Sequence, residues 1–304
     1  MSTEFSWDEF QHLLHQQNNW GRWGNDDQVG ALNLVTPEKR REALSLVRSG
    51  QSISLSRPFP SKPAPNNPLP AQQHLLREKF PHAGASIDYY GISYHGAAAT
   101  HVDALCHVWD EAGMWNGRNP DDELSSFGSR WAGVGNWRNG LISRGVLIDI
   151  PGFRGTDYVS LDRPIHDDEL DAICAHQRVE IQPGDALAVY SGRDRWDAEH
   201  GDAIWGSIAT ERPGLHASCL RFLRSHDVAI LAWDMMDAFP YDWEVRSTVH
   251  AAISAFGVAL VDNCELSDLA QVCRAEKRYE FAFVLSPLFV EGGTGSPANP
   301  LALL

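Results

Sequence analysis

The sequence predicts an α/β fold, and two observations predict it. Five short apolar runs bounded by Gly, Pro or Asp have the composition of strands; they lie at 145–150, 185–192, 228–234, 257–262 and 279–288. Continuous apolar runs are typical of strands that are buried on both faces. Helical stretches alternate with these runs, at 167–177, 215–226 and 265–274, and such alternation favours an α/β architecture.

Two more helices and one strand are predicted before these runs. In the first helix, apolar residues recur at helical spacing after Ser6, which suits an N-cap. The second has Thr36 as its N-cap, Pro37 in its first position and Gly50 as its stop. A loop rich in Gly, Asn and Asp separates the two helices. A short strand is expected within 51–59.

Two segments are predicted to lack regular structure. Six prolines in 58–70 argue against both a helix interior and a central strand, so this segment is expected to be a linker or mobile loop. The last segment, GGTGSPANPLALL, is expected to be an irregular tail.

Composition excludes several classes of function. The formal charge is −15 and Lys and Arg form no long basic run, so no nucleic-acid partner is expected. No stretch approaches the ~20 apolar residues of a membrane span, and the first residues lack the pattern of a signal peptide. The five cysteines are scattered without a CxxC pair, which is typical of reduced thiols. A cytoplasmic protein without a membrane partner is therefore expected.

One stretch, YHGAAATHVDALCHVW at 94–109, concentrates the side chains that carry chemistry. If it is extended, side chains alternate between faces, and His95, His101, Asp103 and His107 share one face. Imidazole and carboxylate groups suit a divalent ion such as zinc, and also manganese or iron. The remaining ligands would come from elsewhere in the chain, and His250, Asp262 and Glu265 are the candidates. The alternative interpretation is a solvated or internally hydrogen-bonded polar patch.

In this stretch the chain resembles a family of metal-dependent hydrolases, the cyclase family. The family includes kynurenine formamidase, isatin hydrolase and a trans-dienelactone hydrolase. The family motif is His-x-Gly-Thr-His-x-Asp-x-Pro-x-His, and ATHVDALCH supplies Thr100, His101, Asp103 and His107 in the same register. A second block of the family runs from a His to an acidic residue followed by Asn. HAAISAFGVALVDN matches it with His250 and Asp262.

The chain also departs from the family pattern. The first motif His falls on Ala97, Gly on Ala99 and Pro on Leu105, while Asp262 stands where Glu is usual. His95 lies two residues before Ala97, about 6.6 Å along an extended strand. His95 is therefore a possible additional ligand only if the strand bends.

The resemblance implies a single-metal site built from His101, Asp103, His250 and Asp262, with zinc as the expected ion and manganese as the alternative. It assigns proton transfer to His107, which would act as general base on a metal-activated water. The implied activity is hydrolysis of a small conjugated or aromatic amide or lactone. The alternatives are a metal-dependent lyase or cyclase, and a degenerate member that binds a ligand without turnover.

Aromatic residues near the motif are candidates for the walls of a substrate pocket. Tyr94, Trp109 and Trp115 lie beside or after the cluster, and Trp23 lies in the N-terminal loop that is expected near the site in longer members of the family.

The resemblance also implies the fold in more detail. It predicts a swivelling β/β/α arrangement, in which helices flank a mixed, barrel-like sheet. Residues 1–50 are expected to form an N-terminal helical extension packed on a main hydrolase domain of residues 51–304. A homodimer or homotetramer is expected, with a small molecule as substrate.

Overall fold

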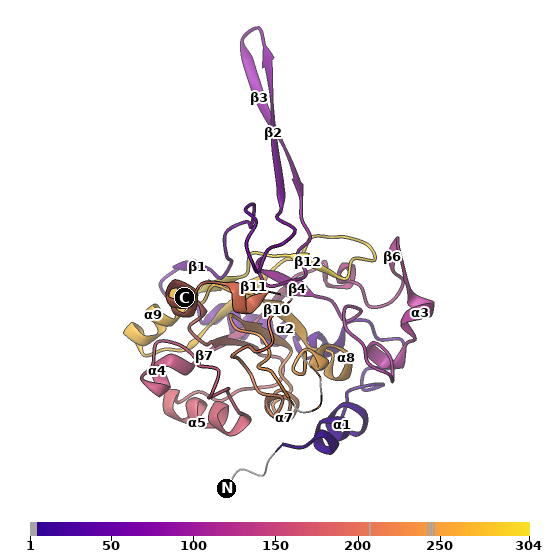
Figure 1. The fold of residues 1–304 in the computed structure, drawn as a ribbon, viewed down its shortest axis with the longest axis vertical. Helices are drawn as coiled ribbons and strands as arrows, with labels where there is room; N and C mark the ends of the chain where they lie inside the picture. Colours follow the sequence, from indigo (N-terminus) through magenta and orange to yellow (C-terminus); the bar gives the residue numbers. More distant parts are fainter. Residues whose placement is uncertain (1–4, 207, 242, 244, 246) are drawn as a thin grey trace.

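The computed structural model describes residues 5–206, 208–241, 243, 245 and 247–304. Its centre is one curled, half-barrel sheet of nine strands in the order β1-β13-β11-β7-β8-β9-β10-β4-β12 (Figure 1). The strands are β1 Ser52–Ser54, β4 His101–Asp103, β7 Leu141–Asp149, β8 Ala186–Tyr190, β9 Ile230–Trp233, β10 Ala259–Asp262, β11 Glu280–Leu285, β12 Gly295–Pro297 and β13 Leu301–Leu303. The predicted α/β class with a mixed, barrel-like sheet is confirmed.

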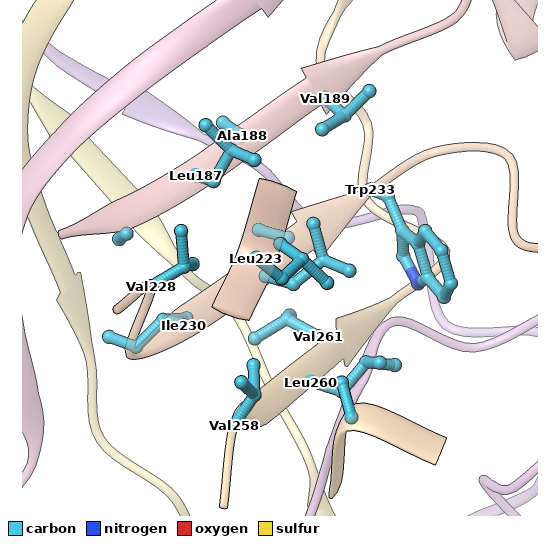
Figure 2. Close-up of a cluster of buried hydrophobic side chains, with 14 of the residues drawn as sticks. Leu187, Ala188, Val189, Leu223, Val228, Ile230, Trp233, Val258, Leu260 and Val261 are labelled. Atoms are coloured by element: carbon cyan, nitrogen blue, oxygen red, sulfur yellow. The ribbon is translucent and has the colours of Figure 1, made fainter. Parts of the chain in front are cut away.

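Four neighbouring strands, β7 to β10, run parallel, and antiparallel strands extend the sheet on both sides. All residues of β8, β9 and β10 are buried, as the continuous apolar runs predict. Helices cover the sheet. Figure 2 shows Leu223 of a covering helix lying over Leu187, Ile230 and Val261 of three adjacent strands.

The helices begin where the sequence supplies caps. Glu9 donates its backbone N–H to Ser6 Oγ over 3.2 Å and Lys39 donates to Thr36 Oγ1 over 3.2 Å, so both predicted N-caps are confirmed. The second helix ends at Ser45, before Gly50. The described α-helices are α1 Trp7–Gln16, α2 Pro37–Ser45, α3 Pro120–Glu123, α4 Ile150–Arg154, α5 Asp167–Gln177, α6 Arg193–His200, α7 Cys219–Ser225, α8 Ala251–Phe256 and α9 Ser267–Glu276. Short 3-10 helices are η1 Gly30–Leu34, η2 Trp115–Gly117, η3 Val134–Trp137 and η4 Ala203–Trp205.

The segment after α1 is bound to α8, which follows His250. Asn19 donates its backbone N–H to the Ala255 carbonyl over 2.9 Å. The Trp20 indole N–H donates to the Ser254 carbonyl over 2.7 Å. The N-terminal residues therefore support the helix whose start lies at the site described below.

The prediction of an irregular C-terminal tail was wrong. Strand β12 pairs with β4, and β13 lies between β1 and β11 inside the sheet. Each strand has only three residues, which is too short for a period-two pattern to show in the sequence.

The extended interpretation of 94–107 was also wrong, since only His101–Asp103 forms a strand. Gly96, at φ 152°, lies in the bend that precedes it. Further strands form outside the central sheet: β2 Gln72–Phe80 pairs with β3 Ala83–Gly91, and β5 Leu124–Ser125 pairs with β6 Gly128–Ser129. The sequence analysis predicted neither pair.

The five cysteines are all buried and unpaired, as their scattered positions predict. Within the described ranges, no helix combines the length and the apolar character needed to cross a membrane.

The C-terminal strand provides a test of the fold. Ala302 of β13 is fully buried, so Ala302→Asp places a carboxylate in the core without a partner. We expect the free energy of unfolding in urea to fall by at least about 3 kcal/mol. Leu303→Asp, one residue along on the opposite and less buried face, is the matched control. Equal losses for the two variants would contradict the placement of β13.

Candidate metal centre

Four polar side chains meet beside the carboxyl ends of the parallel strands β9 and β10. In the pairing of β10 with β4, Asp262 lies opposite His101 and Leu260 lies opposite Asp103. Directly opposed residues of antiparallel strands share a face, so the pairing puts His101, Asp103 and Asp262 together. His250, immediately before α8, completes the group, with Nε2 3.2 Å from Asp262 Oδ2.

Both imidazoles are oriented by a second partner. His101 Nδ1 lies 2.9 Å from the Ala99 carbonyl oxygen, and His250 Nδ1 lies 2.5 Å from Asp237 Oδ2. These oxygens can only accept, so each Nδ1 donates its proton. In the neutral rings that bind a metal, the Nε2 atoms therefore carry the lone pairs, and they face the carboxylates of Asp103 and Asp262. Such outer partners fix the tautomer of metal-binding histidines.

The two carboxylates differ in their partners. Asp262 Oδ1 accepts a hydrogen bond from the Trp233 indole, which Figure 2 shows at the end of β9, beside the end of β10. Asp103 has 1% of its surface exposed, and neither of its oxygens has a hydrogen-bond partner among the described residues. A buried carboxylate without hydrogen bonds is costly unless an opposite charge or a metal compensates it.

His95 reaches the same centre because the chain bends at residues 96–99. Arg193, fully buried, donates to the Ala97 carbonyl over 2.5 Å, while the Asn263 side-chain amide donates to the Gly96 and Ala99 carbonyls over 2.7 and 3.0 Å. The bend places His95 Nδ1 2.9 Å from Asp103 Oδ1.

Strand β12, which pairs with β4, leaves room for His95 to come close to Asp103. Gly295 lies across from Asp103 on β12, and a Cβ there would meet the His95 ring at 3.0 Å and the Val102 carbonyl oxygen at 2.5 Å. Thr294, next to it, lies with Oγ1 2.9 Å from His95 Nε2.

His107 is stacked on His95 rather than bonded to a carboxylate. Their ring centroids are 3.8 Å apart with 4° between the planes, and His107 Nε2 lies 3.9 Å from Asp103 Oδ1. His95 and His107 have side chains 27% and 29% exposed, whereas Asp103 below them is closed to solvent.

Burial and neighbouring charges move the pKa values of these groups apart. Burial would lower the pKa of His101, but the Asp103 carboxylate outweighs it and raises that pKa to about 9. Burial likewise opposes the charge on His250, yet Asp237 and Asp262 raise its pKa well above the usual value. Burial dominates for His107 and lowers its pKa to about 4, below the ~6.5 expected of an ordinary histidine. His107 is therefore a neutral imidazole at pH 7.

A cavity of about 530 Å³ opens above these residues. Its floor contains His95, His101, His107, His250 and Asp262. The walls are mostly apolar and aromatic, from Pro60, Pro68, Leu69, Tyr94, Trp205, Met236 and Phe239. This size and lining are typical of small-molecule sites.

The structure brings Tyr94 to this cavity but not the three tryptophans predicted beside it. Trp115 is fully buried, with its indole N–H bound to the Asp27 carbonyl over 2.9 Å, and Trp23 packs against it. Trp109 is 48% exposed and is not among the residues that line the cavity. These three predictions need correction, because sequence proximity to the motif does not distinguish a core aromatic residue from a cavity wall.

Sequence analysis missed four residues that support the site: Asp237, Trp233, Arg193 and Asn263. Asp237 is fully buried and also accepts the backbone N–H groups of Val249 and His250 over 2.5 and 3.2 Å. Two carboxylates in an otherwise apolar stretch, AWDMMDAFP, were the available signal for Asp237. For Asn263 the signal was its place in the second motif block, directly after Asp262.

The donor set fits a divalent cation. Ligand atoms of Asp103, His250 and Asp262 lie within 4.8 Å of one another, as do those of His95, His101 and Asp103. Imidazole nitrogen and carboxylate oxygen are ligands that zinc accepts, and Asp103 belongs to both groups. Glu265, the other acidic candidate, instead accepts from Ser267.

The chain is similar to known members of one family. The family model described as "Putative cyclase" matches residues 51–238. A crystal structure described as a novel cyclase is 28% identical, with a TM-score of 0.83, over 94% of this chain and 99% of its own. No curated protein matches the chain.

Two isatin hydrolase structures share the fold. One, bound to the product analogue thioisatinate, is 17% identical with a TM-score of 0.56, over 88% of this chain and 99% of its own. Isatin hydrolase A from Labrenzia aggregata, bound to benzyl benzoate, is 17% identical with a TM-score of 0.58, over 86% of this chain and 97% of its own.

Asp237 provides a test of how the His250 imidazole is oriented. Because its carboxylate holds Nδ1 of His250, we expect Asp237→Asn to weaken zinc binding by about 10–100-fold, as measured by competition with a chelator. Asp185→Asn is the control, since Asp185 is equally buried but binds Arg144 and Lys39 away from the site. Unchanged zinc affinity in Asp237→Asn would contradict the orienting role.

Proposed function

The chain belongs to the cyclase family, and on that premise we propose that it is a metal-dependent hydrolase of a small conjugated or aromatic amide or lactone. The observation that carries the proposal is Asp103: its buried carboxylate has no hydrogen bond and lies between the imidazoles of His95 and His101, which themselves line the floor of the cavity. A resident cation explains why such an aspartate is there.

Four residues hold the cation in this proposal: His101, Asp103, His250 and Asp262. The free Nε2 lone pairs of the two histidines and the two carboxylates make up a set of nitrogen and oxygen ligands that suits zinc, with manganese as the alternative. His95 is an additional ligand, since its Nδ1 lies 2.9 Å from Asp103 Oδ1.

A bound divalent cation would polarise the substrate carbonyl and lower the pKa of water, which is chemistry that no side chain here supplies alone. His107 accepts the proton as water attacks the carbonyl carbon, and returns it to the leaving nitrogen or oxygen. Its neutral state at pH 7 leaves a lone pair for this step. The stack on His95 holds the ring at the cavity floor.

The walls of the cavity support a flat, conjugated substrate. Tyr94, Trp205 and Phe239 supply aromatic surface, and Met236 supplies a polarisable one. Isatin, the substrate named for the two related hydrolases, is a planar cyclic amide, and this class of compound is the first to assay here.

The proposed reaction predicts the fate of oxygen. Water adds across the acyl C–N or C–O bond, so each turnover in H₂¹⁸O places one labelled oxygen in a new carboxylate. We expect such labelling with a cyclic amide or lactone from a panel that includes isatin, loss of activity with a chelator, and recovery with zinc or manganese. Turnover without label would indicate a lyase, and ligand binding without turnover would indicate a degenerate member; either result contradicts the proposal.

His107 has a prediction of its own. His107→Ala removes the proton acceptor, so kcat should fall by about 10²–10⁴-fold while the metal content per chain, measured by mass spectrometry, stays at the wild-type value. His12→Ala, at an exposed position on α1, serves as the control. Loss of the metal together with activity would make His107 a ligand and refute its role as a base.

A further inference from the structure

The loop that leads into β4 lines the cavity and has unused backbone donors. Residues 96–99 line the cavity together with three of the candidate metal ligands. The backbone N–H groups of Ala97 and Ala98 donate no hydrogen bond to any described residue. Buried N–H groups without a partner are rare in native proteins, because each costs about as much as a lost hydrogen bond, and Ala97 is only 6% exposed. These two donors therefore require an acceptor outside the described part of the chain.

The carbonyl groups of the same loop are bound by buried side chains. Asn263 donates its side-chain amide to the Gly96 carbonyl over 2.7 Å, and Arg193 donates to the Ala97 carbonyl over 2.5 Å. Both side chains are fully buried, and neither lines the cavity. Asn66, on the cavity wall, adds a longer bond of 3.5 Å to the Ala97 carbonyl. The two carbonyls are therefore turned mainly to the buried side of the loop.

The direction of the carbonyls fixes the direction of the N–H groups. The peptide bonds of the loop are trans, and in a trans peptide the C=O of one residue and the N–H of the next point in opposite directions. Since the carbonyls of Gly96 and Ala97 are turned to the buried side, the N–H groups of Ala97 and Ala98 are turned to the cavity. The side chains of 97–99 are methyl groups and leave them uncovered. Successive N–H groups of this kind bind anions.

The same loop is tied to the metal centre. The Ala99 carbonyl accepts a bond of 3.0 Å from Asn263 and a bond of 2.9 Å from His101 Nδ1. The N–H groups and the candidate ligands therefore keep a fixed separation. Donors that are fixed in advance beside a mostly apolar wall favour an oxygen on which negative charge develops, because they need no reorganisation when the charge appears.

We propose that the backbone N–H groups of Ala97 and Ala98 form an oxyanion-binding site in the cavity. The site takes the carbonyl oxygen of the substrate as that oxygen becomes negative, and afterwards one oxygen of the carboxylate product. The assignment rests on the proposed function, and it adds to the cation two donors that belong to the chain itself.

The two donors act while the carbonyl carbon is tetrahedral. Water forms a bond from its oxygen to the carbonyl carbon and gives a proton to His107, while the π electrons of the carbonyl move onto its oxygen. That oxyanion accepts the two N–H groups. When its electrons return to the carbon, the acyl C–N or C–O bond breaks and the leaving atom takes the proton from His107. The hydrogen bonds are strongest in the transition state, so they raise kcat more than they lower KM.

Replacement of a single backbone N–H tests the assignment. Lactic acid in place of alanine keeps the methyl side chain but exchanges the N–H for an ester oxygen. With a substrate identified by oxygen labelling, Ala97→lactic acid and Ala98→lactic acid should each lower kcat by about 10²–10³-fold, with KM within about threefold. Ala298→lactic acid is the matched control, because the Ala298 N–H donates to the Thr100 carbonyl at the end of the loop over 3.1 Å. This control should keep kcat within about threefold of the wild type.

Benzoate, an aromatic carboxylate, tests the site without turnover. In calorimetric titration of the zinc-loaded protein, we expect benzoate to bind the wild type and Ala298→lactic acid equally, and the other two variants at least about tenfold more weakly. Circular dichroism and zinc content of all variants should match the wild type. This pattern of binding without hydrolysis of any compound in the panel would refute the proposed function alone and leave the anion site standing. No benzoate binding to the wild type, or equal losses in all three variants, would overturn the proposal.

Discussion

The buried carboxylate of Asp103 sets the requirement that the surrounding structure meets. It has no hydrogen bond among the described residues, and its nearest polar neighbours are imidazoles, His95 at 2.9 Å and His101 at 3.3 Å. At this depth an uncompensated charge would cost several kcal/mol, and it is balanced either by protonated His101, whose pKa the carboxylate raises to about 9, or by a bound cation. The position of Asp103 is therefore consistent with a cation that shares its oxygens, and the other candidate ligands are arranged around that point.

Rigid elements of the fold fix the positions of these side chains. His101, Asp103 and Asp262 lie on paired strands, so their relative positions follow from the register of the sheet. Asp237 and Trp233, themselves fully buried, hold His250 and Asp262 from behind. Sites built on strands with supporting hydrogen bonds keep their geometry more closely than sites on loops, and the cavity above leaves one side open to a substrate.

The sequence was enough to propose the candidate centre but not the residues that support it. His101, Asp103, His250 and Asp262 could be predicted because residue type and spacing carry the chemistry. The approach of His95 to Asp103 could not be predicted, because it depends on a bend in the chain. That bend is held by side chains about a hundred and more residues away, as the hydrogen bond from Arg193 to the Ala97 carbonyl shows. The tryptophans failed as predictions for the same reason: packing, and not proximity to a motif, decides which aromatic residues reach a cavity. The helical caps at Ser6 and Thr36 succeeded because they are local.

The most direct test of the account is a crystal structure of the zinc-loaded protein with anomalous diffraction measured at the zinc edge. The account predicts a peak about 2.0–2.2 Å from Nε2 of His101 and His250 and from oxygens of Asp103 and Asp262. A second peak beside His95 would extend the site to two ions and keep Asp103 as the shared ligand. No peak within bonding distance of Asp103, in protein that holds zinc elsewhere or not at all, would contradict the central claim.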